Sequence, residues 1–333
     1  QEQGPGSLFI LNSKSHPLQK FILRLLAFLA LQAIVACVLF RFTSTQNSNH
    51  YLAVMEDKID RLESLTGERL VILGGSNTVF GMHSDVIEAA THYPVVNLGL
   101  HVSLGLEFPM RCYLPHARAG DIVVLCPEYH VMMDESQQIG DPIVTNQLTE
   151  QWPSAKKYLP RETPESLKQF LDHDGLLLAH QWVSRSIKMI RGRDRQSDKL
   201  YRRSSFNEYG DLVGHYKIKS GELTAFGGIP TPEEALLEET VSIINRFASQ
   251  CKEKGVEVYF SFPPFAESAF EDSQSAISLT ETYLREKCKI VYLNRPTDNI
   301  YSDHCFHDSV YHLNGPTGLT QSTRLAKSIM VHR

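Results

Sequence analysis

Short apolar runs that alternate with helical segments constrain the fold of this chain more than any other feature. Five runs read as buried strands, at residues 69–75, 93–99, 121–127, 256–264 and 289–295. Helical patterns follow them, at residues 84–90 (with Ser84 as the expected N-cap), 105–117, 233–255, 273–287 and 315–332. Strands that alternate with helices pair in parallel, and the helices cover both faces of the sheet. We therefore expect an α/β fold around one parallel sheet.

Residues 135–232 do not follow this rhythm. They are polar, contain several prolines, and mix short helical pieces with loops. We expect them to form an insertion or lid beside the carboxyl edge of the sheet.

An apolar segment near the N-terminus predicts a membrane anchor. Residues 21–40 hold one charged residue, Arg24. A helix of about 20 residues spans the ~30 Å hydrocarbon core of a bilayer, and Arg24 can reach the headgroups from near its end. A cleaved signal peptide is the alternative, but the run is longer than a usual h-region and no A-x-A site follows it.

The charges around this segment predict its orientation. Lys14 and Lys20 precede the apolar run, whereas acidic residues soon follow Arg41. The positive-inside rule then places the N-terminus in the cytoplasm and the rest of the chain outside. The expected organisation is a tag and cytoplasmic tail, a transmembrane helix, a helical stalk and an extracytoplasmic domain, at residues 1–16, 17–41, 42–67 and 68–333.

The charge balance argues against a nucleic-acid partner. The 333 residues include 33 Lys plus Arg and 38 Asp plus Glu, which gives a formal net charge of −5. Proteins that bind nucleic acids usually present a basic face. The six cysteines include no C-x-x-C pair, which excludes a zinc ribbon or a thioredoxin-type motif.

A glycine turn after the first expected strand offers a nucleophile. Gly74 and Gly75 are followed by Ser76 and Asn77. Ligands of open α/β sheets bind at the carboxyl ends of the strands, where a helix N-terminus also offers N–H donors to an anion. The structural alternative is an ordinary glycine turn in which Ser76 caps the next helix.

A serine nucleophile needs a base, which is often a histidine oriented by a carboxylate. Between the last expected strand and the last helix, the sequence contains His304, His307, Asp308 and His312. In the expected topology this loop returns to the same sheet edge as Ser76. A zinc site formed by these four residues is the alternative, because imidazole and carboxylate groups suit zinc.

In order along the chain, these motifs resemble the SGNH (GDSL-like) hydrolase superfamily. The similar blocks are Gly74-Gly75-Ser76-Asn77, Asn97-Leu98-Gly99 and Asp308…His312. The resemblance implies a flavodoxin-like, three-layer parallel sheet, SGNH-hydrolase-like, preceded by one transmembrane helix. It also implies that Ser76 is the nucleophile, that His312 is the base and that Asp308 orients it, with the N–H groups of Ser76 and Gly99 holding the oxyanion.

Two departures from the family pattern bear on the chemistry. Asp308 and His312 are four residues apart, where the usual spacing is three. The third block normally supplies an oxyanion asparagine, but the corresponding place reads Cys126-Pro127-Glu128-Tyr129-His130. A missing donor of this kind can cost ~10²–10³ in rate. Either Tyr129 or Asn77 replaces it, or the hydrolase chemistry is weakened, which would suit a transferase that must not lose its acyl group to water. Glu128 and Tyr129 are expected to line the pocket.

The sequence from Asp308 to Asn314 is similar to the membrane-anchored branch of SGNH-like proteins, which includes relatives of the teichoic-acid D-alanylation and alginate O-acetylation factors. This resemblance implies an O-acyltransferase without a cofactor or metal, anchored in a bacterial inner membrane with its domain in the periplasm or outside. Its implied partners are a multi-spanning membrane-bound O-acyltransferase and a polysaccharide acceptor. The alternatives are an esterase that uses the same residues and a non-catalytic module that binds a polymer or scaffolds a partner.

Overall fold

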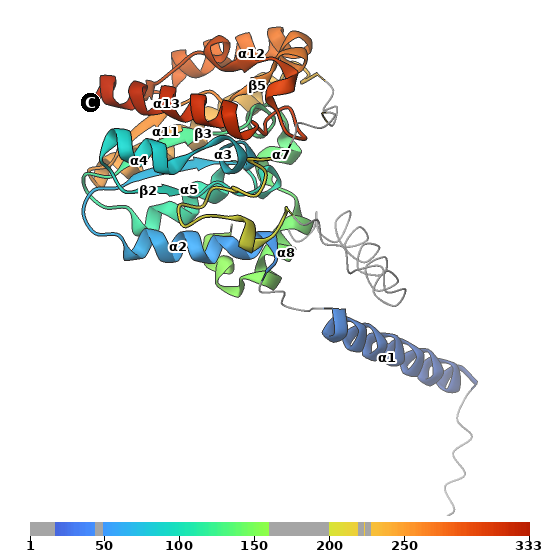
Figure 1. Cartoon of the computed structure of the whole chain (residues 1–333). Helices are drawn as coiled ribbons and strands as arrows, with labels where there is room; N and C mark the ends of the chain where they lie inside the picture. The colour runs from blue at the N-terminus through green and yellow to red at the C-terminus, as the bar shows by residue number, and fades with distance from the viewer. Residues whose placement is uncertain (1–16, 44–48, 160–199, 219–222, 224–227) are drawn as a thin grey trace, which may run out of the picture. The chain divides into compact units, whose positions relative to one another are not determined.

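The computed structural model describes residues 17–43, 49–159, 200–218, 223 and 228–333 (Figure 1). The chain divides into two units, of which one contains helix α1 and the other contains all the remaining described elements. Each unit is described by itself.

Helix α1 spans Pro17–Thr43 and includes the apolar segment 21–40. Among the described residues, no helix meets the combined requirement of length and apolarity for crossing a bilayer. The membrane span and its orientation stay predictions.

A five-stranded parallel sheet forms the centre of the larger unit, which confirms the expected α/β class. Its strands pair in the order β2-β1-β3-β4-β6, and every pair is parallel. The bounds are β1 Leu70–Gly74, β2 Val95–Asn97, β3 Ile122–Cys126, β4 Glu257–Phe260 and β6 Val291–Tyr292. A second, two-stranded parallel sheet pairs β5 (Phe265–Ala266) with β7 (Ile300–Tyr301). All five predicted strands are present, although each is shorter than its apolar run.

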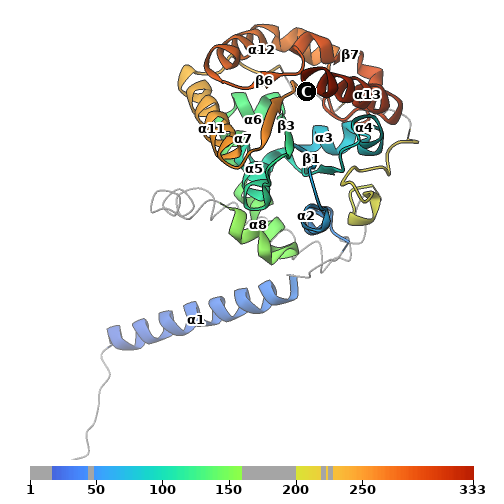
Figure 2. The ribbon, with the colours of Figure 1, turned by 90° about the vertical axis from the view of Figure 1, so that its left-hand side faces the viewer.

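Helices cover both faces of the sheet because the strand side chains alternate between the faces. Leu70 and Ile72 of β1 pack with α4 and α13, whereas Val71 and Leu73 pack with α2, α5 and α11. Figures 1 and 2 show α4 beside α13, with the sheet between them and α2. The helix bounds are α2 Val54–Ser64, α3 Ser76–Gly81, α4 Ser84–Thr91, α5 Glu107–Tyr113, α6 Tyr129–Met133, α7 Glu135–Ile139, α8 Pro142–Gln151, α11 Glu234–Glu253, α12 Glu267–Lys287 and α13 Gly315–His332.

Two local expectations are wrong. The segment predicted as a stalk includes α2, whose Met55 and Leu62 are buried in the core, so this helix is a layer of the domain. Amphipathic spacing marks a helix with one apolar face but does not say what that face packs against. Ser84 does not cap α4 either: the N-cap is His83, and the Ser84 hydroxyl instead donates to Asp211.

The predicted insertion is only partly described. Helices α7 and α8 belong to it, and residues 200–218 pack against the larger unit. Residues 160–199, in the middle of the predicted insertion, lie outside the described residues.

Candidate active site

Ser76 lies at the turn between β1 and α3, at the carboxyl edge of the parallel sheet. Strand β1 ends at Gly74, and α3 begins at Ser76, so a single residue separates the two elements. Gly75 allows Glu128 to approach the turn closely: a Cβ atom at this position would lie 2.7 Å from Glu128 Oε1, so a larger residue would displace that carboxyl group. The turn therefore brings the Ser76 hydroxyl against the end of the neighbouring strand β3.

Ser76, His312 and Asp308 form a continuous chain of hydrogen bonds. The Ser76 hydroxyl lies 2.7 Å from His312 Nε2, and His312 Nδ1 lies 2.7 Å from Asp308 Oδ1. The residues 308–312 form a turn rather than a helix, in which the His312 N–H donates to the Ser309 carbonyl at 3.1 Å. This turn brings the two side chains together despite their four-residue spacing.

Two aromatic residues hold the side chains of this hydrogen-bonded series in place. The Phe80 ring stacks on the His312 ring, with centroids 4.0 Å apart and planes 5° apart. The Tyr201 hydroxyl donates to Asp308 Oδ2 at 2.7 Å. Burial raises the pKa of Asp308. The hydrogen bond from His312, the charge of His312 and the hydrogen bond from Tyr201 act in the opposite direction, and together they lower the pKa of Asp308 to about 2. Asp308 is thus ionised across the physiological range and can stabilise a charged His312.

Glu128 also contacts Ser76. It lies just after β3, and its side chain is 3% exposed. Its Oε1 atom accepts from the Ser76 hydroxyl at 3.0 Å and from the Asn77 backbone N–H at 2.9 Å. Burial raises the pKa of Glu128 above its ordinary value, and hydrogen bonds from Asn77 and Ser76 and the nearby His312 only partly oppose this.

The other residues expected at the oxyanion position have different partners. The Gly99 N–H donates to the Asn97 side chain at 3.1 Å, so in this arrangement it is bound within its own turn. The buried Asn77 side chain donates to the Cys126 carbonyl at 2.9 Å and accepts from the Gly75 N–H at 3.0 Å. Asn77 therefore contributes its backbone N–H to the region around Ser76, whereas its side-chain amide stabilises the turn.

Tyr129 does not line the pocket, which corrects the expectation from sequence. Its side chain is fully buried and packs against the rings of Phe262 and Phe265, at centroid distances of 6.4 and 5.2 Å. The reason is its position at the start of α6, which turns successive side chains away from each other. Within the described ranges, no group of three or more His, Cys, Asp or Glu side chains is arranged to hold a metal ion.

An open pocket of about 470 Å³ adjoins Ser76. Its walls combine aromatic side chains with hydrogen-bonding ones, and they also include Ser76, Glu128, Asp308 and His312. The further residues are Tyr51, His101, Val102, Ser103, His130, Asp134, Gln137, Tyr201, Ser309 and Tyr311. In a pocket of this kind the polar side chains can fix the orientation of a ligand.

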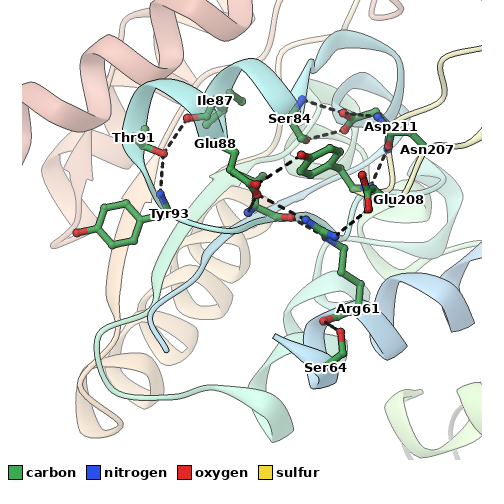
Figure 3. A network of polar contacts seen from close by, with 12 residues as sticks. Arg61, Ser64, Ser84, Ile87, Glu88, Thr91, Tyr93, Asn207, Glu208 and Asp211 are labelled. Carbon is green, nitrogen blue, oxygen red and sulfur yellow. Dashed lines mark hydrogen bonds and ion pairs between the residues drawn. The ribbon is translucent and has the colours of Figure 1, made fainter. Parts of the chain in front are cut away.

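Sequence reasoning missed the residues that brace the site from the segment 206–216. Gly210 has a φ of +96° and turns the chain so that Asp211 enters the core. Asp211 accepts from the Ser84 hydroxyl at 2.7 Å (Figure 3). It also accepts from the Asn97 amide at 2.9 Å. This carboxylate therefore joins the start of α4 to the end of β2. The glycine and polar residues of the segment were visible in sequence, but their partners lie more than a hundred positions away.

Lys58 supports the same region from α2. Its side chain is 1% exposed, and its ammonium group donates to the Gly99 carbonyl. Burial lowers the pKa of Lys58 to about 7, although Asp211 and Asp57 oppose this shift.

No protein-family model matches the sequence, and a search of curated proteins finds no match either.

Proposed function

We propose that this protein is a membrane-anchored, extracytoplasmic, SGNH-like O-acyltransferase that works through a serine acyl-enzyme. The observation that carries the proposal is the chain from Ser76 through His312 to Asp308, with both contacts at 2.7 Å. A hydroxyl within hydrogen-bond reach of an imidazole, which a carboxylate orients in turn, is the arrangement that activates serine for acyl transfer.

Each residue would have one role in the reaction. Ser76 Oγ attacks the carbonyl carbon of an acyl donor while His312 Nε2 takes its proton. The Asn77 and Ser76 backbone N–H groups lie at the start of α3 and offer bonds to the developing oxyanion. The leaving group takes the proton from His312, and His312 then removes a proton from an acceptor hydroxyl that attacks the acyl-serine. The new ester bond forms, the Ser76 Oγ–C bond breaks, and Ser76 Oγ takes the proton back from His312.

The pocket supports a sugar or polyol as the acceptor. Tyrosine rings and polar side chains share its walls, and a volume of about 470 Å³ admits a sugar unit. With the domain outside the membrane, cytoplasmic acyl donors cannot reach Ser76, so a multi-spanning O-acyltransferase would deliver the acyl group. Residues 21–40 would hold the domain beside that partner.

Intact-mass measurement after incubation with 4-nitrophenyl acetate tests the proposal. We expect one acetyl adduct on the wild type and none on Ser76→Ala, with the adduct persisting in water. Fast turnover without an adduct would indicate the esterase, which uses the same residues. An adduct retained in Ser76→Ala, or wild-type protein that gains none and hydrolyses none, would contradict the proposal and favour a binding module.

A further inference from the structure

The two hydrogen bonds at the Ser76 hydroxyl cannot both form in the ordinary charge state of the site. A hydroxyl donates one proton, but Ser76 Oγ lies 2.7 Å from His312 Nε2 and 3.0 Å from Glu128 Oε1. If His312 were neutral and Glu128 ionised, both neighbours would only accept. One of them must therefore carry a proton when both contacts exist.

Only one of the two proton positions leaves the nucleophile ready. A proton on His312 prevents it from accepting the Ser76 proton, which the acylation step requires. A proton on Glu128 leaves His312 Nε2 free to accept from Ser76, while Glu128 donates to Ser76 Oγ. The competent arrangement thus contains a neutral Glu128.

Glu128 also stands where the missing oxyanion donor belongs. It follows β3 at the position where the expected asparagine is absent, and it touches both the Ser76 hydroxyl and the Asn77 N–H. A carboxylate there competes with an oxyanion for the N–H groups, whereas a carboxylic acid can donate to it.

We propose that Glu128 is a catalytic residue which replaces the oxyanion asparagine, and that Ser76 accepts an acyl group only while Glu128 is protonated. This inference rests on the proposed acyl-transfer function. The burial that raises the pKa of Glu128 supports it, because burial favours the neutral form.

The acylation step balances without another reactant. The Ser76 Oγ–C bond forms, the Ser76 proton moves to His312 Nε2, and the carbonyl π electrons move to the oxygen. This oxyanion accepts hydrogen bonds from the Asn77 N–H and from the Glu128 acid group. When the C=O bond reforms, the ester C–O bond breaks and the leaving oxygen takes the proton from His312. Glu128 keeps its own proton throughout.

The oxyanion and Glu128 Oε1 cannot occupy the same point, so the carboxyl group must turn aside. A cavity of about 20 Å³ borders Glu128 and is lined mainly by apolar residues, among them Val102, Met110 and Leu125. A neutral carboxyl group can turn toward such a space at much lower cost than an ionised one.

The groups that influence this proton come from several elements. They include the charge of His312, the thiol of Cys126 and the hydroxyls of Tyr51 and Tyr311. His101 and Asp134 line the same pocket. Glu128 itself lines the pocket and contacts Ser76 Oγ directly.

The pH dependence of Ser76 acetylation by 4-nitrophenyl acetate tests the inference with the full chain. For the wild type we expect a bell-shaped rate, which rises as His312 loses its proton and falls as Glu128 ionises. Glu128→Gln keeps the shape and a donor group but cannot ionise. Its rate should therefore not fall at alkaline pH, and the ratio of variant to wild-type rate should grow about tenfold for each pH unit above the Glu128 ionisation.

Asp134→Asn is the matched control, because it removes another carboxylate from the pocket wall. Whatever the overall acetylation rate of Asp134→Asn, this rate should still fall at alkaline pH. An alkaline fall that persists in Glu128→Gln would overturn the role of Glu128, while a Ser76-dependent adduct would leave the acyl-transfer proposal intact.

Infrared difference spectra give a readout that needs no activity. We expect a protonated-carboxyl band in the wild type and in Asp134→Asn, absent from Glu128→Gln and lost as pH rises. If the wild type forms no adduct at any pH, the acyl-transfer proposal fails and this band alone decides the protonation of Glu128. A wild type without the band at the pH of fastest reaction contradicts the inference.

Discussion

The ring of Phe80 lies parallel to the ring of His312, 4.0 Å away between centroids. Phe80 belongs to α3, the same six-residue helix that begins with Ser76. Residues four positions apart lie on one face of a helix, so Ser76 and Phe80, whose ring supports His312, project from the same face of α3. A single short helix thus sets the distance between Ser76 and His312, which are 236 positions apart.

Phe80→Leu should slow Ser76 acetylation about tenfold without changing the binding of the ester. The leucine side chain fills part of the space but offers no flat surface, so the His312 ring loses its fixed orientation. A displaced general base costs rate because acyl transfer depends on orientation. Stopped-flow acetylation rates at several ester concentrations would separate the rate constant from binding.

The same change at another buried phenylalanine separates orientation from stability. Phe262→Leu also removes a fully buried ring. Both variants should lose about 1–3 kcal/mol of unfolding free energy, measured with urea. Equal slowing of acetylation in the two variants would show that the Phe80 stacking has no specific role.

Tyr201→Phe should slow acetylation about fivefold, because it removes the bond to Asp308 Oδ2. A bond to a charged group is worth about 1.5–3 kcal/mol, and we discount this to about 1 kcal/mol since Asp308 is partly exposed. Asp308→Asn removes the charge itself and should slow the reaction by about 10²–10⁴. Acetylation rates at one neutral pH compare the three proteins, and equal losses in the two variants would contradict this ranking.

Much of the fold was predictable because strand and helix periodicity is local. The runs at 69–75 and 121–127 became β1 and β3, and the pattern at 233–255 became α11. The burial of α2 was not predictable, since its apolar face fits a stalk and a domain layer equally well. What a helix packs against depends on contacts distant in sequence.

The candidate site likewise contains some residues that the sequence predicted and others that it did not. Ser76, Asp308 and His312 were chosen from motifs, and the structure brings all three together. Tyr201 gave no signal, because a tyrosine in a polar insertion has no distinctive neighbours. Glu128 was expected only as a pocket residue, since its bond to Ser76 depends on how β1 and β3 pair.

Asp211→Ala should destabilise the protein by about 1–3 kcal/mol and slow acetylation. The change leaves the buried donors of Ser84 and Asn97 without their acceptor. Glu208→Ala is the control in the same segment, because its ion pair with Arg61 is exposed and should contribute about 0–1 kcal/mol. Urea unfolding measures both, and a larger loss for Glu208→Ala would contradict the role of Asp211 as the brace.

Lys58 predicts an unusual dependence of stability on pH. Its pKa is lowered by burial to about 7 in the folded protein, whereas the unfolded chain keeps the ordinary value of 10.5. Between these values the unfolded state binds more protons, so the contribution of Lys58 to the unfolding free energy increases with pH, by at most about 1.4 kcal/mol per pH unit. Below pH ~7 both states are charged and the contribution is constant.

Lys58→Met removes this titration and keeps a side chain of similar length. The variant also loses the bond to the Gly99 carbonyl, so its absolute stability is not diagnostic. The difference between wild type and variant is diagnostic: it should shift in favour of the wild type as pH rises from about 7 to 9. Chemical unfolding across this range measures it, with Lys156→Met as the control because Lys156 is exposed. A difference that stays constant with pH would show that Lys58 remains charged in the folded protein, held by Asp211 and Asp57.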